Sequence, residues 1–481
     1  MTTLLSHFIA GASRPSSGGA TLQDLNPSDA RDVVAELPVG TGQDAAAAVA
    51  AASEALPSWR RMTGPARAEL LHRWAAAIDG RAEEMAQLLA REVGKPIAEA
   101  RGEVGRCIVI LRYYAGDAVR SVGEVVPAQS AGALQYTLRE PLGVVALITP
   151  WNFPVAIPLW KAAPALAFGN TVVLKPSEHS PAAALLLAET ANSAGLPPGV
   201  FNVLLGSGAE AGEALLRADA VRGVSFTGSA AVGKRVAAIG AERNIRYQTE
   251  MGGKNVVIVL PDADLDLAAR LTAAGAMRYA GQKCTATSRA IVSRKVEGPF
   301  LDKLRAQVDG LALGPVTDPA AAVGPVISAA SRDRIRTALG AVRGEVVIGG
   351  GQPQGAAFTN GYFVTPTIVR GVSADDALAQ EELFGPVLAV LEADGLDDAI
   401  GLANHSRYGL SASLFTRDIG AALRYIHQIE VGLVRVNGDT TGVDPHAPFG
   451  GMKGSSSGSR EQGTAAREFY TETKTVQVSP A

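Results

Sequence analysis

The chain has 481 residues, of which 47% are hydrophobic and 19% are charged, and its formal net charge at pH 7 is −3. This length exceeds what a single hydrophobic core organises, so we expect a globular, water-soluble protein of two or more domains. The small negative charge excludes the basic surface that nucleic acids and anionic membranes require, so neither is an expected partner.

The N-terminus and the cysteines indicate a cytoplasmic protein. The opening MTTLLSHFIAG lacks the basic region and the long apolar stretch of a signal peptide, and no apolar run is long enough to span a bilayer. Two cysteines, Cys107 and Cys284, are too few for a disulfide framework and are typical of a reducing compartment. We expect Cys107, in the apolar stretch CIVILRYY, to be a core residue. No metal site is expected.

The first part of the chain is predicted to be mainly helical. Strand-like arms and turns extend to about residue 42. Helical patterns then cover 44–56, with Asp44 as the cap, 65–78, which Pro65 opens, and 99–115.

From Pro141 onward, short β-branched segments alternate with helical patterns. The strand segments are LGVVALITP, TVVLKP, VFNVLLG and VRGVSFTG, and the helical patterns between them cover 158–168, 180–194 and 209–217. This alternation predicts an α/β fold with a parallel, doubly wound sheet. Ligands of such sheets bind beyond the carboxyl ends of the strands, where this chain carries TPWN, KPSE, GSG and FTGS.

A second α/β half is predicted to begin near Gly252. NVVIVLPDADLD indicates a strand and a capped helix that runs toward GQKC, and RAIVSRK and SASLFTRD indicate further strands. The last segment, TKTVQVS, alternates like an exposed edge strand. Such a strand pairs either with another subunit or with a hairpin from 121–140.

Three residues offer the chemistry of acyl transfer. Cys284, between the small residues Gly281 and Thr285, has a thiol that attacks carbonyl carbon once it is accessible and deprotonated. Glu250, in TEMGGKN, offers a base for a thiol or a water if burial raises its pKa toward neutrality. Asn152, in TPWNFP, offers an amide donor to an oxyanion. A structural cysteine, a solvated carboxylate and a turn-capping asparagine remain the ordinary alternatives.

The order of several short motifs is more specific than any one of them. The chain contains, in this order, TPWNFP, KPSE, FTGSAAVG, EMGGK, GQKC, EELFGP and PFGGMK. This series resembles the aldehyde dehydrogenase superfamily over essentially the whole chain. The resemblance implies a non-acylating, NAD(P)-dependent enzyme that oxidises an aldehyde to a carboxylate. It also implies a Rossmann-type cofactor domain, an α/β catalytic domain and a small β oligomerisation arm.

The resemblance assigns chemical roles to five residues. Cys284 matches the nucleophile, which forms a thiohemiacetal and then a thioester, and Asn152 and the Cys284 amide match the donors to its oxyanion. Glu250 matches the base that activates the hydrolytic water. Lys161 and Glu461 match a pair that helps to relay protons. A surface lysine and a structural carboxylate are the alternative for that pair.

The cofactor site departs from the common dinucleotide fingerprint, because no G-x-G-x-x-G follows the first strand. By resemblance, FTGSAAVG replaces it, and Ser229 and the first free N–H groups of a helix receive the pyrophosphate. Glu178 would bond free ribose hydroxyls and repel a 2′-phosphate, which favours NAD, whereas Lys175 leaves NADP open. The implied cofactor contacts are Thr149, Pro150, Trp151, Lys175, Ser177, Glu178, Phe226, Thr227, Gly228, Ser229, Gly233, Glu382 and Phe384.

The substrate is expected to carry a carboxylate as well as the aldehyde. Arg278 stands six residues before Cys284, nearly two helical turns, so both are expected to face one cleft. An arginine there can grip a carboxylate with two hydrogen bonds. An arginine paired with a structural carboxylate is the alternative. The resemblance places Phe153, Trp160 and Phe449 beside the substrate.

The amino-acid sequences of five longer segments resemble most closely those of the α-ketoglutaric semialdehyde (2,5-dioxovalerate) dehydrogenases. These segments are GRCIVILRYYAGD, PWNFPVAIPLWK, GQKCTATSR, GLVRVN and APFGGMKGSSSGSREQG. Trp160 stands where succinic semialdehyde dehydrogenases usually carry a second arginine. Glu178 is less suited to NADP, which some α-ketoglutaric semialdehyde enzymes prefer. Succinic semialdehyde, an aromatic or aliphatic aldehyde, and a non-catalytic binding protein of the same fold remain the alternatives.

The resemblance also implies how the chain divides and associates. Residues 1–120 and 141–252 form the predicted NAD(P)-binding domain, and 253–455 form the predicted catalytic domain. Residues 121–140 and 465–481 form the predicted arm, and we expect a homodimer or a homotetramer.

Overall fold

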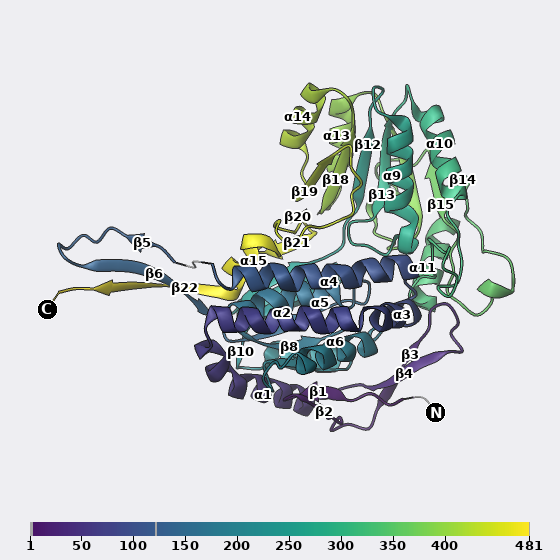
Figure 1. The fold of residues 1–481 in the computed structure, drawn as a ribbon. Coiled ribbons are helices and arrows are strands. Elements are labelled where there is room, and N and C mark those ends of the chain that lie inside the picture. Colours follow the sequence, from purple (N-terminus) through teal and green to yellow (C-terminus); the bar gives the residue numbers. More distant parts are fainter. Residues whose placement is uncertain (1–2, 121–122, 481) are drawn as a thin grey trace.

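The computed structural model describes residues 3–120 and 123–480. Residues 1–2, 121–122 and 481, which belong to the predicted cofactor domain and arm, lie outside the described residues. Figure 1 shows two α/β lobes and a narrow arm that extends from the lower lobe and ends at the C-terminus. Within the described ranges, no helix is both long and apolar enough to cross a membrane.

The lower lobe is organised by a sheet of strand order β2-β1-β9-β8-β7-β10-β11-β21. These strands are β1 (His7–Ile9), β2 (Ala12–Arg14), β7 (Val144–Ile148), β8 (Thr171–Lys175), β9 (Phe201–Val203), β10 (Val221–Thr227), β11 (Arg246–Glu250) and β21 (Ser456–Gly458). The central strands from β9 to β11 run parallel, whereas β1 and β21 pair antiparallel at the two sides. The predicted parallel sheet is confirmed.

Alternate residues of the central strands enter different cores, which explains why these strands are apolar throughout. On β7, Val145 and Leu147 belong to one buried cluster, and Val144 and Ala146 belong to another on the opposite face. Successive side chains of a strand point to opposite faces, so a strand covered by helices on both sides shows a continuous apolar run.

Helices cover both faces of this sheet, as Figure 1 shows for α1 on one side and for α2, α4 and α5 on the other. The helices of this lobe are α1 (Gly42–Arg61), α2 (Gly64–Gly80), α3 (Ala82–Val93), α4 (Ile97–Asp117), α5 (Ala156–Ala167), α6 (Pro181–Ser193), the π-helix η1 (Gly208–Gly212), α7 (Glu213–Arg217) and α8 (Ala230–Glu242). The helix predicted at 44–56 differs from α1. Thr41 is its actual cap, Asp44 completes the capping box, and the helix continues through Pro57.

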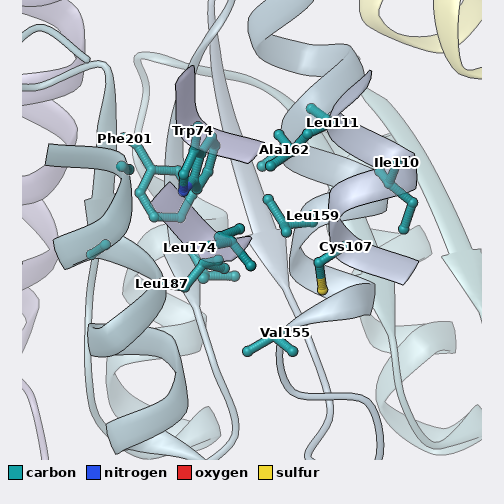
Figure 2. Close-up of a cluster of buried hydrophobic side chains, with 14 of the residues drawn as sticks. Trp74, Cys107, Ile110, Leu111, Val155, Leu159, Ala162, Leu174, Leu187 and Phe201 are labelled. Atoms are coloured by element: carbon teal, nitrogen blue, oxygen red, sulfur yellow. The ribbon is translucent and has the colours of Figure 1, made fainter. Parts of the chain in front are cut away.

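Figure 2 shows the larger core, in which Trp74 contacts Phe201 edge-on with ring centroids 5.3 Å apart. The indole N–H of Trp74 donates to Thr190 Oγ1 at 2.9 Å, so its polar atom is satisfied inside the core. Cys107 is fully buried in the same cluster. Its predicted role as a core residue is confirmed.

The upper lobe contains a second sheet, of strand order β14-β15-β16-β13-β12-β18-β19. Its strands are β12 (Asn255–Val259), β13 (Thr287–Ser293), β14 (Glu345–Ile348), β15 (Thr367–Arg370), β16 (Val387–Ala393), β18 (Ser411–Phe415) and β19 (Leu433–Val436). All the pairs are parallel except β14 with β15. Its helices are α9 (Leu265–Met277), the 3₁₀-helix η2 (Arg278–Gly281), α10 (Glu297–Asp309), α11 (Ala329–Gly340), η3 (Ala356–Phe358), α12 (Ala377–Gln380), α13 (Leu396–Asn404) and α14 (Ile419–Gln428).

Two small strand pairs and the arm complete the fold. The small pairs are β3 (Thr21–Leu25) with β4 (Val33–Pro38) and β17 (Tyr408–Gly409) with β20 (Met452–Lys453). The arm consists of β5 (Val125–Val126), β6 (Leu134–Pro141) and β22 (Thr471–Val478), the last of which follows α15 (Gly463–Tyr470). β22 pairs antiparallel with β6 along its whole length, which confirms the predicted pairing with the 121–140 region.

Candidate active site

Cys284 lies where two cavities meet, and its side chain lines both. The first cavity is bordered by residues that follow strands of the lower sheet and by EELFGP of the upper lobe. The second lies between α4, α5 and the loops at 283–285 and 441–443. A thiol placed between two cavities can contact one ligand on each side.

Many of the predicted cofactor residues line the first cavity together. They are Pro150, Trp151, Thr227, Gly228, Ser229, Glu382 and Phe384. The rings of Trp151 and Phe384 meet edge-on there, with centroids 5.6 Å apart. Thr149 is buried immediately before them, where its N–H donates to Lys175 O at 3.1 Å.

The turn from β10 into α8 brings backbone close to an aromatic ring. A Cβ on Gly228 would lie 2.6 Å from Phe226 Cζ, and one on Gly233 would lie 2.5 Å from Met251 Sδ. A side chain at either place would therefore require Phe226 or Met251 to move. Ser229 is the N-cap of α8, whose unpaired N–H groups suit a phosphate, so the residues of this turn fit a dinucleotide.

Three of the predicted cofactor contacts, Lys175, Ser177 and Glu178, lie at the end of β8 and just after it. Lys175, the last residue of that strand, is buried, and its Nζ lies 3.6 Å from Glu178 Oε2. The Glu178 side chain is 43% exposed, so its carboxylate can still receive hydroxyl donors. The Ser177 hydroxyl accepts from His179 N at 3.2 Å and shapes the turn between them.

Hydrogen bonds hold both the side-chain amide and the backbone carbonyl of Asn152 in the wall of the first cavity. Its Nδ2 donates to Gln282 O at 3.1 Å, and its own carbonyl accepts from Lys95 Nζ at 2.7 Å. Gln282 is fixed in turn, because Ile327 N donates to its Oε1 at 2.9 Å. Asn152 thus has a fixed place in the wall of the cavity that Cys284 also lines.

A buried ion pair supports the Asn152 loop from beneath. Lys95 and Glu103 lie almost fully inside the protein and form a salt bridge with each other. Glu103 Oε1 also accepts from Val155 N and Ala156 N at 3.0 Å each, which satisfies the first turn of α5. The pair thus connects the loop before α4, the helix α4 and the start of α5.

The backbone around Cys284 is fixed by amide and hydroxyl donors. Asn255 Nδ2 donates to Cys284 O at 2.8 Å and to Ala286 O at 2.9 Å, and Thr440 Oγ1 donates to Thr285 O at 2.7 Å. Burial, followed by the nearby carboxylates of Glu250 and Glu382, raises the pKa of the Cys284 thiol to about 12. In this arrangement the thiol is protonated at neutral pH.

Glu250 is buried at the end of β11, and it lines neither cavity at Cys284. Its Oε2 accepts from Ser456 Oγ at 2.6 Å. Burial, followed by repulsion from Glu461, raises the pKa of Glu250 well above its usual range. Such a carboxyl group is suited to exchange a proton near neutrality.

Lys161 and Glu461 form a buried ion pair, as the predicted relay requires. Ser225 joins them, because Lys161 Nζ donates to Ser225 Oγ at 2.8 Å and that hydroxyl lies 3.1 Å from Glu461 Oε1. Gln248 Nε2 also donates to Ser225 Oγ at 2.9 Å. The alternative of a surface lysine is wrong.

The spacing argument for Arg278 is wrong. α9 ends at Met277, and Arg278 is the residue at which the chain leaves the helix. Tyr279 and Ala280 then adopt left-handed conformations with φ of 54° and 51°, so the path to Cys284 is not helical. Arg278 is exposed and is not among the residues that line either cavity at Cys284.

Another arginine lines the second cavity. Arg106 lies on the face of α4 that also carries Glu99, Gly102 and Ile110, and its side chain is 40% exposed. Its Nη1 donates to Val443 O and lies 3.9 Å from Asp444 Oδ1. No hydrogen bond from its other guanidinium nitrogens to a described residue is seen, so these N–H groups can donate to an anionic ligand in the cavity.

Two aromatic side chains also line the second cavity. Phe153 and Trp160, both predicted to contact the substrate, line it. Phe449 is buried behind Trp160, with ring centroids 5.6 Å apart, so it supports the wall and does not border the cavity. Lys95 Nζ lies 4.0 Å from the ring centroid of Phe153 and orients that ring from below.

Several residues of this site were missed by sequence reasoning. They are Lys95, Glu103, Arg106, Asn255, Gln282 and Ser456. The signals available were weak: charges at 103 and 106 interrupt an apolar helix, and GKP follows a helix. Their partners lie far away in the sequence, so only the fold identifies them.

The buried pair gives a stability prediction. In Glu103→Gln, the Lys95 ammonium keeps its charge inside the protein without a counter-ion, which typically costs about 3–5 kcal/mol. We expect a large fall in the midpoint of thermal unfolding. Combining it with Lys95→Met should cost less than the sum of the two single changes, because no isolated charge remains.

Glu99→Gln is the matched control on the same helix. Glu99 pairs with Lys283 at 2.8 Å nearer the surface, with side chains 25% and 12% exposed. Its loss should cost only about 1 kcal/mol. Equal unfolding midpoints for Glu103→Gln and Glu99→Gln would contradict a structural role for the buried pair.

Comparison with known proteins agrees with this geometry. The aldehyde dehydrogenase family matches residues 14–476. The α-ketoglutaric semialdehyde dehydrogenase of Bacillus subtilis is 44% identical over 477 residues, which are 98% of each chain. The α-ketoglutarate semialdehyde dehydrogenase of Haloferax volcanii is 42% identical over 480 residues, 99% of each. The crystal structure of an NAD-dependent aldehyde dehydrogenase from Sinorhizobium meliloti has a TM-score of 0.96 and 37% identity, over 100% of this chain and 96% of that one.

These similarities cover nearly the whole chain, including both lobes and the arm. The protein therefore belongs to the aldehyde dehydrogenase family and is an NAD(P)-dependent aldehyde dehydrogenase.

Proposed function

We propose that this enzyme oxidises the aldehyde group of a semialdehyde that also carries a carboxylate, such as α-ketoglutaric semialdehyde. The observation that carries the substrate class is Arg106, a cation in the wall of the second cavity. The names of the Bacillus subtilis and Haloferax volcanii relatives point to the same class of substrate.

The first chemical step that we propose joins the substrate to Cys284. The Cys284 thiol gives its proton to solvent water, its sulfur attacks the aldehyde carbon, and the carbonyl oxygen becomes the oxyanion of a thiohemiacetal. Asn152 Nδ2 and the backbone N–H of Cys284 donate to that oxyanion. The chemistry that NAD supplies when bound is acceptance of a hydride from this carbon, which leaves a thioester on Cys284.

The second step is hydrolysis of the thioester. Glu250 takes one proton from a water molecule, the water oxygen bonds to the thioester carbon, the carbon–sulfur bond breaks, and the second proton of the water passes to the leaving sulfur, which releases the carboxylate and restores the Cys284 thiol. Glu250 must swing toward Cys284 for this step. We propose that the Lys161–Glu461 pair, whose charges act on Glu250, relays this proton away from Glu250.

We propose NAD as the preferred cofactor, with residues of the first cavity as its binding site. The free edge of the Glu178 carboxylate suits ribose hydroxyls and repels a 2′-phosphate. Lys175, 3.6 Å from that carboxylate, limits the repulsion and leaves NADP usable. We also propose the cytoplasm as the location, because Cys107 and Cys284 are both free thiols.

Replacing the nucleophile tests the reaction itself. Cys284→Ala should form no NADH with any aldehyde, because no covalent intermediate can arise, while NAD binding measured by fluorescence titration should persist. Cys107→Ala is the control, since this second thiol is buried in the core and should be dispensable for turnover. Normal turnover by Cys284→Ala, or none by the native protein across a broad aldehyde panel, would contradict the proposed chemistry.

Replacing each arginine tests the substrate class. Arg106→Met keeps the length of the side chain and removes a charge-assisted contact, which is typically worth about 1.5–3 kcal/mol. We expect kcat/KM for α-ketoglutaric and succinic semialdehyde to fall about tenfold to a hundredfold, with little change for propanal.

Arg278→Met is the matched control for that comparison. Because Arg278 lines neither cavity at Cys284, the same substitution there should leave both substrate classes unaffected. A selective loss of semialdehyde activity in Arg278→Met, or equal losses for all aldehydes in Arg106→Met, would reject Arg106 as the carboxylate contact.

We propose that the arm pairs with another copy of the chain and produces a homodimer or a homotetramer. The support is its exposed apolar side chains, since Val125 is 77%, Leu134 49% and Leu138 38% exposed. The arm also extends away from both lobes, with β5 at an open edge (Figure 1).

Substituting charged residues for exposed apolar residues of the arm tests this proposal. The double variant Val125→Glu and Leu134→Glu should sediment as a smaller species than the native protein, because the charges oppose burial. Val109→Glu, at a position of α4 that is 51% exposed, adds the same charge outside the arm and should not change sedimentation. A native protein that sediments as a monomer would disprove the association.

A further inference from the structure

Glu250 and Ser456 are brought together by strand register. β11 and β21 pair antiparallel, and Glu250 lies directly opposite Ser456 in that pairing. The two side chains meet at the end of the sheet, where Ser456 Oγ lies 2.6 Å from Glu250 Oε2. Gly450, whose φ is +150°, leaves the necessary room, because a Cβ there would lie 2.8 Å from Glu250 Oε1.

The direction of this hydrogen bond is fixed by a third group. Gly451 N donates to Ser456 Oγ at 2.6 Å, so the hydroxyl acts as an acceptor toward the backbone. Its single proton is left to donate to Glu250. Glu250 Oε1 has no hydrogen-bond partner among the described residues, so Ser456 provides the directional contact that holds this carboxyl group.

Other charged and titratable groups act on Glu250 without holding it. Glu461 and Arg460 follow β21, Lys161 comes from α5, and Cys284 lies across the site. Glu461 disfavours a charge on Glu250, whereas Lys161 and Arg460 favour it. These effects are little changed by small rotations of the Glu250 side chain, but a hydrogen bond is directional.

We propose that Ser456 is a positioning residue for the base, whose hydroxyl holds the Glu250 carboxylate against β21 and outside both cavities until thioester hydrolysis begins. Before that step, an empty space beside Cys284 leaves room for substrate and cofactor. The inference rests on the proposed role of Glu250, and Glu250→Gln tests that role separately.

The hydrogen bond that the Ser456 hydroxyl donates to Glu250 affects the pH dependence of thioester hydrolysis. A hydrogen bond to the carboxylate stabilises the charged form, and the Ser456 hydroxyl accordingly lowers the pKa of Glu250 against the larger, opposing effect of burial. Without the hydroxyl, the pKa of Glu250 rises, and a smaller fraction is deprotonated at any pH below it. In a variant without the hydroxyl, the rate of thioester hydrolysis should therefore fall first at the acidic end of the pH range.

The experiment follows decay of the acyl-enzyme on Cys284 by rapid quenching and intact-protein mass, with propanal and NAD, as a function of pH. In Ser456→Ala, the acidic limb of the hydrolysis rate should move about one pH unit upward, because a charge-assisted hydrogen bond of this kind is lost. The initial burst of NADH, which precedes hydrolysis, should keep its amplitude. Propanal carries no carboxylate, so the result does not depend on Arg106.

Ser457→Ala is the matched control. The hydroxyl of Ser457 belongs to the same strand, but it pairs with Thr249 Oγ1 at 2.6 Å and does not contact Glu250. Its removal should leave the pH profile unchanged. Ser456→Thr, which keeps a hydroxyl, should restore the native limb, and Ser456→Cys, a weaker donor, should shift it in the same direction as alanine by less.

The possible outcomes distinguish the proposed role of Glu250 as the base from the proposed role of Ser456 in positioning it. If Glu250→Gln hydrolyses the thioester at the native rate, Glu250 is not the base and the proposed mechanism fails. If Glu250→Gln accumulates the acyl-enzyme but Ser456→Ala and Ser456→Cys both keep the native pH limb, only the role of Ser456 is overturned. An equal shift in Ser457→Ala would also overturn it, because the effect would then belong to the strand and not to the hydroxyl.

Discussion

The active site depends on the buried ion pair between Lys95 and Glu103. Glu103 binds the first N–H groups of α5, and Lys95 binds the carbonyl of Asn152, so one pair fixes both the helix and the loop that precedes it. Removing two charges from water is costly unless their hydrogen bonds are completed. Here the backbone completes them, and the position of Asn152 is thereby tied to the packing of α4 on α5.

The two cavities follow from that arrangement. α4 and α5 form the wall of the second cavity, the strand ends of the lower sheet form the first, and Cys284 lies between them. A substrate entering on one side and a cofactor on the other reach the same sulfur without competing for space. The carboxyl group of Glu250 lies outside both cavities and contacts β21 through Ser456.

Much of the fold was predictable because its signals are local. The strands at 144–148, 171–175, 201–203 and 221–227 are apolar and β-branched, and a chain with this alternation forms a parallel sheet covered on both faces. The alternating C-terminal strand predicts pairing with another subunit or with the 121–140 region, and the structure shows the second of these. The cap of α1 was misplaced by three residues, because Thr41 and Asp44 share a capping box and only geometry distinguishes their positions.

The site was predictable only in part, for the same reason. The sequence by itself determined the family, through an ordered series of motifs, and with it the candidate nucleophile, base and oxyanion donor. It could not determine contacts between distant segments. The spacing of six residues between Arg278 and Cys284 predicts a shared cleft only on a continuous helix, but α9 ends at Met277, before Arg278, and left-handed residues follow. Arg106 reaches the cavity through the packing of α4, and Ser456 meets Glu250 through strand register across 206 residues. Tertiary structure alone decided these contacts, because side-chain interactions depend on distance in space, which spacing along the chain predicts only within one regular element.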